Sequence, residues 1–112
     1  MQASRGQRRH HLIFYLEIRD RGSNEPLGFL SNITPDGMQV LSERPLAVGK
    51  SFELEICRPG MTRQPVRCRA RSIWSKADTD PGYYATGFQF EDIPAMTLQA
   101  IERLIRDLGF DS

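Results

Sequence analysis

Phe52-Glu53-Leu54-Glu55-Ile56 and Val66-Arg67-Cys68-Arg69-Ala70-Arg71 are the two stretches that decide the fold class of this chain. In both, apolar and charged residues alternate strictly. Successive side chains of a β-strand point to opposite faces, so this period of two predicts two strands that each bury one face and expose the other. A loop opened by Arg58-Pro59-Gly60 joins them, and the pair is therefore predicted to form an antiparallel hairpin.

The apolar faces of these two strands must meet, and this requirement predicts their pairing. The alignment places Ile56 opposite Cys68 and Leu54 opposite Ala70 inside, and Glu55 opposite Arg69 and Glu53 opposite Arg71 outside. Each such ion pair contributes about 0.2–1 kcal/mol. The arginines are therefore interpreted as a solvated, ion-paired face in preference to a nucleic-acid surface. Cys57 and Cys68 fall on opposite faces, so no disulfide is expected.

Four further segments have strand patterns, and the end of the chain changes to a helical period. The strands are expected at residues 12–18, 27–33, 38–41 and 84–90, between turns rich in Gly, Asn and Pro. The helix has an apolar stripe made of Leu98, Ile101, Leu104, Ile105 and Leu108. Asp92 or Ile93 is expected to cap it and Gly109 to follow it. This order predicts a mainly β fold, a six-stranded antiparallel β-barrel with a C-terminal α-helix packed against its open end.

Length and composition limit what the protein does. A chain of 112 residues with 39% hydrophobic and 26% charged residues is expected to be one soluble domain with a single core. Its net charge of +1 gives little overall attraction to nucleic acid or to a membrane surface. No apolar stretch approaches the roughly 20 residues that span a bilayer, and the basic N-terminus lacks the apolar region of a signal peptide. We therefore expect a cytoplasmic protein without membrane insertion.

Two short polar motifs flank the first predicted hairpin. Arg5-Gly6-Gln7-Arg8-Arg9 has an R-x-x-x-R spacing, and Asn32-Ile33-Thr34-Pro35-Asp36-Gly37 has an N-x-T-x-x-G spacing that forms a turn. Arg presents a planar fork of donors that matches the edge of guanine and the oxygens of phosphate. Arginines beside a polar turn therefore favour a receptor for guanine or phosphate. Taken alone, the first motif also fits a solvated tail and the second a plain turn.

These motifs, with Gly87-Phe88-Gln89-Phe90 in the last strand, resemble the PilZ domain, the bacterial receptor domain for cyclic di-GMP. Its motifs are RxxxR and (D/N)xSxxG, and its late strand has a G-x-x-F element. The resemblance runs from about Arg5 to about Gly109. It implies a split barrel at residues 12–112, preceded by a flexible basic arm at residues 1–11. It also implies non-enzymatic binding of cyclic di-GMP with no cofactor, and an unidentified protein partner whose interaction is switched when the arm closes.

The ligand-binding residues that this resemblance implies are Arg5, Arg8, Arg9, Asn32, Thr34 and Gly37. The arginines would grip phosphate and guanine, with either Arg5 or Arg8 acting beside Arg9. Asn32 and Thr34 would read the guanine edge, and Gly37 would let the backbone turn tightly beside it. The turn departs from the family pattern, because Asn replaces the commoner Asp and Thr replaces Ser. Asn lacks the charge that strengthens a hydrogen bond, so the first change bears directly on affinity.

Two other functions are compatible with the sequence. A PilZ-like adaptor would bind protein partners without nucleotide. A small-barrel RNA or single-strand binder would use Arg8, Arg9 and an exposed aromatic such as Tyr15. The low net charge argues against the second, so nucleic acid is not the expected partner.

The remaining chemically active residues have structural explanations. His10-His11 point to opposite faces of a strand, which disfavours a metal site. Trp74 is expected to cap the barrel or pack beneath the helix, in preference to stacking on a base. Asp78 and Asp80 are expected in a solvated loop. No pairing of nucleophile and base is visible, so the sequence does not predict an enzyme.

Overall fold

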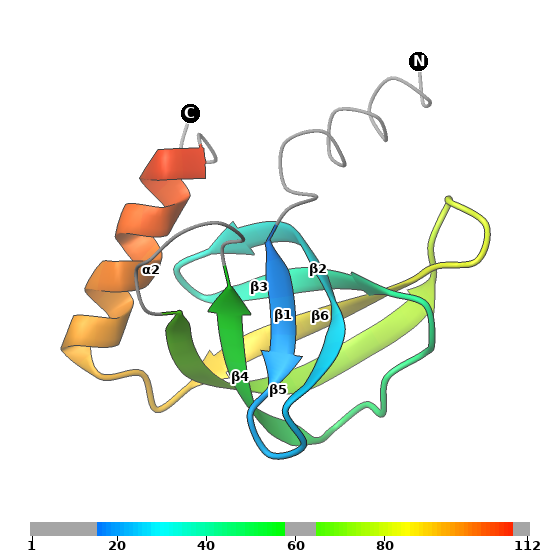
Figure 1. Cartoon of the computed structure of the whole chain (residues 1–112), viewed down its shortest axis with the longest axis horizontal. Coiled ribbons are helices and arrows are strands. Elements are labelled where there is room, and N and C mark those ends of the chain that lie inside the picture. Colours follow the sequence, from blue (N-terminus) through cyan, green and yellow to red (C-terminus); the bar gives the residue numbers. More distant parts are fainter. Residues whose placement is uncertain (1–15, 58–64, 109–112) are drawn as a thin grey trace.

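The computed structural model describes residues 16–57 and 65–108, and there the chain forms six strands followed by one helix (Figure 1). The elements are β1 (Glu17–Asp20), β2 (Glu25–Thr34), β3 (Gly37–Ser42), β4 (Ser51–Cys57), β5 (Val66–Ala77), β6 (Tyr84–Glu91) and α2 (Ala95–Leu108). Every strand pairs antiparallel with its neighbours, and the order β1-β2-β3-β6-β5-β4 closes into a barrel. The predicted mainly β fold, a six-stranded antiparallel barrel with a C-terminal helix, is confirmed.

Alternation along the strands fills the inside of the barrel with apolar side chains. On β4, Phe52, Leu54 and Ile56 are buried, whereas Glu53 between them is exposed. Cys68 and Ala70 on β5 belong to the same core cluster. Full burial of a Leu or Ile side chain contributes about 1.5–3 kcal/mol, so a continuous core of this kind stabilises the closed barrel.

Helix α2 adds its apolar stripe to this core. Ile101, Leu104 and Ile105 are buried among the barrel residues, and Leu108 packs against them. The helix stands at one end of the barrel in Figure 1, where it contacts β2 and β5. The amphipathic pattern of the sequence therefore predicts both the helix and the face that it buries.

The start of the helix differs from the prediction. Leu98 N donates to Pro94 O at 2.9 Å, so Pro94 provides the first carbonyl of the helical ladder and occupies the cap position. Asp92, one of the two expected caps, has a φ of 49° and lies in the bend after β6. The expected position of Gly109 after the helix lies outside the described residues.

The pairing of β4 with β5 corrects the predicted register by two residues. Leu54 lies opposite Cys68, Phe52 opposite Ala70, Glu53 opposite Arg69 and Glu55 opposite Arg67. The inward and outward faces are as predicted, because a shift of two residues preserves them. The ion-paired face is also confirmed. Arg67 Nε lies 3.1 Å from Glu55 Oε2, and Arg69 Nε lies 3.3 Å from Glu53 Oε2.

The two cysteines are free, as expected from their opposite faces. Cys68 is buried, and Cys57 is half-buried on the other side of the hairpin. Burial raises the pKa of the Cys68 thiol to about 12.

Some predictions fall outside the described ranges. They concern the arm at residues 1–11, its boundary with the barrel, and residues 12–15 of the first strand. In the described part of that segment, Leu16 and Ile18 are buried, and the strand continues to Asp20. Within residues 16–57 and 65–108, no helix has the length and apolar character needed to cross a membrane.

Candidate ligand-binding site

The hairpin between β2 and β3 carries the N-x-T-x-x-G motif in a turn with its own hydrogen bonds. Asp36 N donates to Thr34 Oγ1 at 3.2 Å, and Thr34 Oγ1 donates to Gly37 O at 3.5 Å. Ile33 N donates to Asn32 Oδ1 at 2.9 Å. Both Asn32 and Thr34 are exposed. A side-chain carbonyl has two lone pairs, so Asn32 retains acceptor capacity beside its two N–H donors.

Gly37 is required by the close approach of β6, a constraint that the sequence pattern did not reveal. A Cβ at this position would lie 2.1 Å from the carbonyl oxygen of Phe88, whereas its φ lies outside the left-handed region. Phe90 N also donates to Asp36 O at 2.9 Å. The tip of the hairpin is therefore held against β6, which fixes the position of the motif on the barrel.

Strand β5 contains a β-bulge that sequence alternation did not reveal. Ser72 pairs with Phe88 and Trp74 with Gly87, so Ile73 is an extra residue without a partner of its own on β6. Before the bulge, even-numbered residues face the core. Beyond it, Ser75 meets the buried Thr86 through hydroxyls 3.0 Å apart. The bulge therefore reverses the alternation.

The bulge brings two large apolar side chains to the outer surface. Ile73 is 49% exposed and Trp74 is 37% exposed. The prediction that Trp74 caps the barrel or packs beneath the helix is wrong, because the change of alternation turns its indole outward. The sequence contains a signal for this break. Ile73 and Trp74 are two adjacent bulky residues, and they follow a run that alternates strictly up to Ser72.

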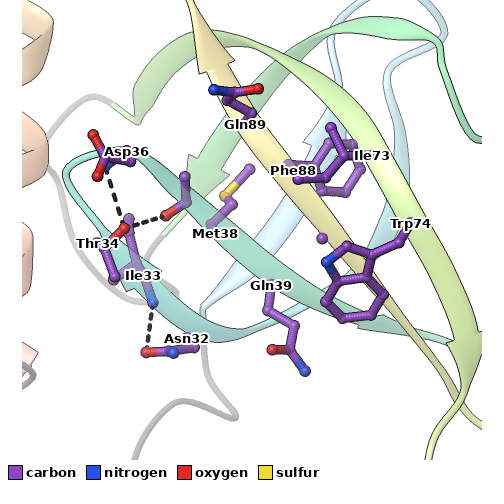
Figure 2. A pocket seen from close by; sticks show the side chains of 12 residues that line it. Asn32, Ile33, Thr34, Asp36, Met38, Gln39, Ile73, Trp74, Phe88 and Gln89 are labelled. Carbon is purple, nitrogen blue, oxygen red and sulfur yellow. Dashed lines mark hydrogen bonds between the residues drawn. The ribbon is translucent and has the colours of Figure 1, made fainter.

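Register places the outward residues of four strands in two rows across the barrel surface. The first row is Asn32, Gln39, Gly87 and Trp74, and the second is Thr34, Gly37, Gln89 and Arg71. Neighbouring strands lie about 4.8 Å apart, so the first row extends about 14 Å from Asn32 to Trp74. Figure 2 shows Gln39 between these two side chains, with Thr34 and Asp36 on the hairpin side. Residues far apart in sequence thus form one surface.

A cavity of about 360 Å³ lies on this surface. Its described lining consists of Asn32, Ile33, Thr34, Asp36, Gly37, Met38, Gln39, Ile73, Trp74, Gly87, Phe88 and Gln89. Asp36 is the one ionisable residue in that lining. The rest offers three amides, a hydroxyl, an indole, a phenyl ring, a thioether and aliphatic groups. Such a surface suits a planar group with a hydrogen-bonding edge and an apolar face.

The structure brings together three of the six residues that the sequence nominated. Asn32, Thr34 and Gly37 all line the cavity. Arg5, Arg8 and Arg9 lie outside the described residues. The sequence did not single out Gln39, Trp74, Gly87 or Gln89 as one surface, because strand pairing and the bulge bring them together.

Other candidate chemistry has little support among the described residues. Asp78 and Asp80 lie in the loop between β5 and β6, as expected, where Asp80 N donates to Asp78 Oδ2 at 3.1 Å. In the described part of the chain, no group of three or more His, Cys, Asp or Glu side chains is arranged to hold a metal ion. His10 and His11 lie outside it.

Comparison with known proteins gives one family. A model described as the PilZ domain matches residues 4–107 of this chain. A comparison with curated protein sequences finds no significant match.

Solved structures with the same fold include two bacterial proteins, one of them represented by two structures. The PilZ domain of YcgR from Escherichia coli, with c-di-GMP, has 17% identity and a TM-score of 0.61, covering 86% of this chain and 83% of that chain. The Bacillus subtilis inhibitor of motility MotI/DgrA has 19% identity and a TM-score of 0.67, covering 87% and 48%. Escherichia coli YcgR in complex with c-di-GMP has 17% identity and a TM-score of 0.64, covering 86% and 41%. The chain thus spans less than half of the two longer structures, and these likenesses show a shared fold.

Proposed function

This chain belongs to the PilZ domain family, and on that premise we propose that it is a receptor that binds cyclic di-GMP without catalysing a reaction on it. The observation that carries the proposal is the cavity at the family motif. Asn32 and Thr34 line it from β2, whereas Gln39 lines it from β3 and Trp74 from β5. The fold of the YcgR PilZ domain, which was solved with c-di-GMP, adds support.

The polar hairpin residues are proposed to read a guanine edge. Asn32 offers an acceptor and two donors, and the Thr34 hydroxyl accepts and donates. Guanine needs both kinds of partner. Trp74 offers an aromatic surface, and stacking of a base on an aromatic side chain contributes about 1–3 kcal/mol. Hydrogen bonding and stacking would together orient the base on the barrel.

The positive charge for the phosphates is proposed to come from Arg5, Arg8 and Arg9. Cyclic di-GMP carries one negative charge on each of its two phosphodiesters, whereas the described lining of the cavity contributes the carboxylate of Asp36. Arg forms charge-assisted, often bidentate hydrogen bonds with phosphate. The motif containing Arg5 and Arg9 supplies the side chains that such a ligand requires.

Closure of residues 1–11 over the ligand is the proposed switch. Fixing the backbone of one residue costs about 1–2 kcal/mol, so the arginine contacts must exceed the cost of ordering the arm. The closed arm would present a new surface to a protein partner in the bacterial cytoplasm. Ligand concentration would then control the partner interaction.

Calorimetric titration with cyclic di-GMP tests the proposal, with GTP as the control for nonspecific nucleotide binding. We expect saturable binding of cyclic di-GMP and none of GTP at the same concentrations. The Asn32→Ala variant should bind more weakly. Equal heats for both nucleotides, or no heat for cyclic di-GMP, would contradict the proposal.

A nucleotide-independent adaptor is the second candidate function. Ile73 and Trp74 expose apolar surface, and the carboxylate of Asp36, which lines the same cavity, opposes an anionic ligand. An apolar patch of this kind suits a protein partner. Absence of cyclic di-GMP binding, with the fold intact by circular dichroism, would favour this function.

A further inference from the structure

We propose that Gly87 is a positioning residue for ligand recognition, because its lack of a side chain allows Trp74 to lie over β6 in line with Gln39 and Asn32. The inference rests on the proposed function and deepens it. It assigns the stacking surface of the site to a Trp–Gly pair across two strands. Gly87 itself need not contact the ligand.

Steric distances carry the argument. A Cβ built on Gly87 would lie 2.3 Å from Nε1, 2.4 Å from Cε2 and 2.8 Å from Cζ2 of Trp74. Favourable contacts between nonbonded heavy atoms occur at about 3.5–4.0 Å. The obstructing group is a rigid bicyclic ring, so a small shift of a chain end does not relieve the clash. Any side chain at position 87 therefore requires the indole to move.

The strand pairing explains why the indole lies there. Trp74 is the direct partner of Gly87 on β6, immediately after the bulge at Ile73. A glycine in a strand has no side chain to cover its own backbone. An aromatic residue paired with it on the neighbouring strand can place its ring over that backbone. Lys76 Nζ also lies 5.4 Å from the centre of the indole ring, in the range of a cation–π contact. Bulge, glycine and lysine together define the position of the ring.

In this position the indole lies in the same cross-strand row as the amides of Gln39 and Asn32. Gly87 is paired with Gln39, and Gln39 with Asn32, so the ring extends over the one member of the row that has no side chain. A base between the hairpin and the indole would meet amides along its edge and an aromatic ring at the far end. If the ring moves away, the amides remain but the stacking surface is lost.

The first experiment uses the ligand-free protein, because Trp74 is the single tryptophan of the chain. Gly87→Ala should shift the fluorescence emission of Trp74 and increase its quenching by acrylamide. Gly22→Ala is the matched control, since Gly22 lies in the β1–β2 turn and its added Cβ would have only Asp20 Oδ1 nearby, at 3.3 Å. An unchanged Trp74 emission in Gly87→Ala would overturn the inference whether or not the protein binds nucleotide.

The second experiment is a double-mutant cycle on cyclic di-GMP binding. Gly87→Ala should weaken binding roughly tenfold, as expected from the loss of one base–aromatic stack, and Trp74→Ala should do the same. In the Trp74→Ala background, Gly87→Ala should cause no further loss. Equal losses in both backgrounds would show that Gly87 acts independently of the ring and would overturn the inference. Failure of the parent protein to bind would contradict the proposed function instead.

The unfolding temperatures of the same variants provide a third test. If Gly87→Ala lowers the unfolding temperature or fails to fold, the double variant with Trp74→Ala should recover stability, because it removes the atoms that clash. A double variant as unstable as Gly87→Ala would overturn the proposed steric relation.

Discussion

Asp36 gives the described wall of the cavity a negative character, although the proposed ligand is an anion. Amides, a hydroxyl and an indole recognise shape and hydrogen-bonding pattern, but they do not offset phosphate charge. The arginines of the N-terminal motif are therefore expected to dominate affinity, whereas the hairpin and Trp74 are expected to determine which base is accepted. Substitutions at the two groups should consequently have different effects on affinity and on the preference for guanine.

Arg9→Ala should weaken cyclic di-GMP binding about 10- to 100-fold, because a hydrogen bond to a charged group contributes about 1.5–3 kcal/mol. Arg67→Ala is the control of equal charge change. Arg67 is paired with Glu55 on the β4–β5 hairpin and does not line the cavity. Calorimetric titration measures both. Equal losses would indicate diffuse electrostatic attraction and would contradict the assignment of the site.

Substitutions of Asn32 test whether its side chain forms hydrogen bonds with the edge of guanine. Asn32→Ala should weaken binding, and Asn32→Asp should preserve or strengthen it, because a carboxylate is a stronger acceptor for the N–H groups of guanine. Titration of both variants against the parent protein measures the difference. If both bind like the parent, the turn has only a structural role.

Cys68 allows a test of burial at a single residue. Its pKa is raised to about 12 by burial, so its thiolate population at pH 8 is far smaller than that of an exposed cysteine. Cys57→Ser leaves this thiol alone in the folded protein, and we expect alkylation at pH 8 to require unfolding. Mass spectrometry after timed treatment with iodoacetamide, with and without urea, measures the rate of Cys68 alkylation in the Cys57→Ser variant. Rapid alkylation of the folded variant would mean that the barrel interior is open.

At the scale of elements, α2 is expected to be part of the barrel core. Ile101 is fully buried, and its truncation to Ala should lower the free energy of unfolding by about 2–5 kcal/mol. Arg103→Ala changes an exposed position two residues away and should stay within about 0.5 kcal/mol of the parent. Urea unfolding followed by circular dichroism compares them. Similar midpoints would show that the helix contributes little to the core.

The strands and the helix were predictable from sequence where apolar residues recur with a regular period. Alternation indicated which faces of β4 and β5 are buried, but it could not determine their register, because a shift of two residues keeps every side chain on its face. In hairpins, turn type and loop length fix the register, and the alternation of side chains does not encode either. Glu53 and Arg69 are therefore partners, although the pattern paired Glu53 with Arg71.

The candidate site was predictable only in the part that is continuous in sequence. Asn32, Thr34 and Gly37 lie within six residues and form a recognisable motif. Gln39 and Trp74 join them through pairing across four strands, and the bulge at Ile73 reverses the face on which Trp74 lies. A single sequence does not reveal a long-range strand order, so these residues became candidates only on the folded barrel.

At the scale of the whole molecule, the barrel provides a fixed surface, and in the proposed mechanism the N-terminal motif closes onto it. The hairpin tip is attached to β6 through the bond from Phe90 N to Asp36 O, and Gly37 allows the close approach of the strands. Helix α2 packs on β2 and β5 at the end of the core. Ligand binding is therefore expected to change the motif segment and the hairpin more than the core.

Hydrogen exchange with mass spectrometry tests this division of roles. Residues 1–9 are mostly polar and contain Gly6, so their amides are expected to exchange rapidly in the free protein. On addition of cyclic di-GMP, exchange should slow at residues 5–9 and 32–37, because the arginines and the turn are both proposed to contact the ligand. It should change little at residues 101–105, since Ile101, Leu104 and Ile105 are already buried in the core. A flat profile despite measured binding would contradict arm closure. Absence of binding together with residues 5–9 already slow to exchange would instead favour the protein-only adaptor, because an arm ordered without nucleotide has no ligand-dependent transition to report.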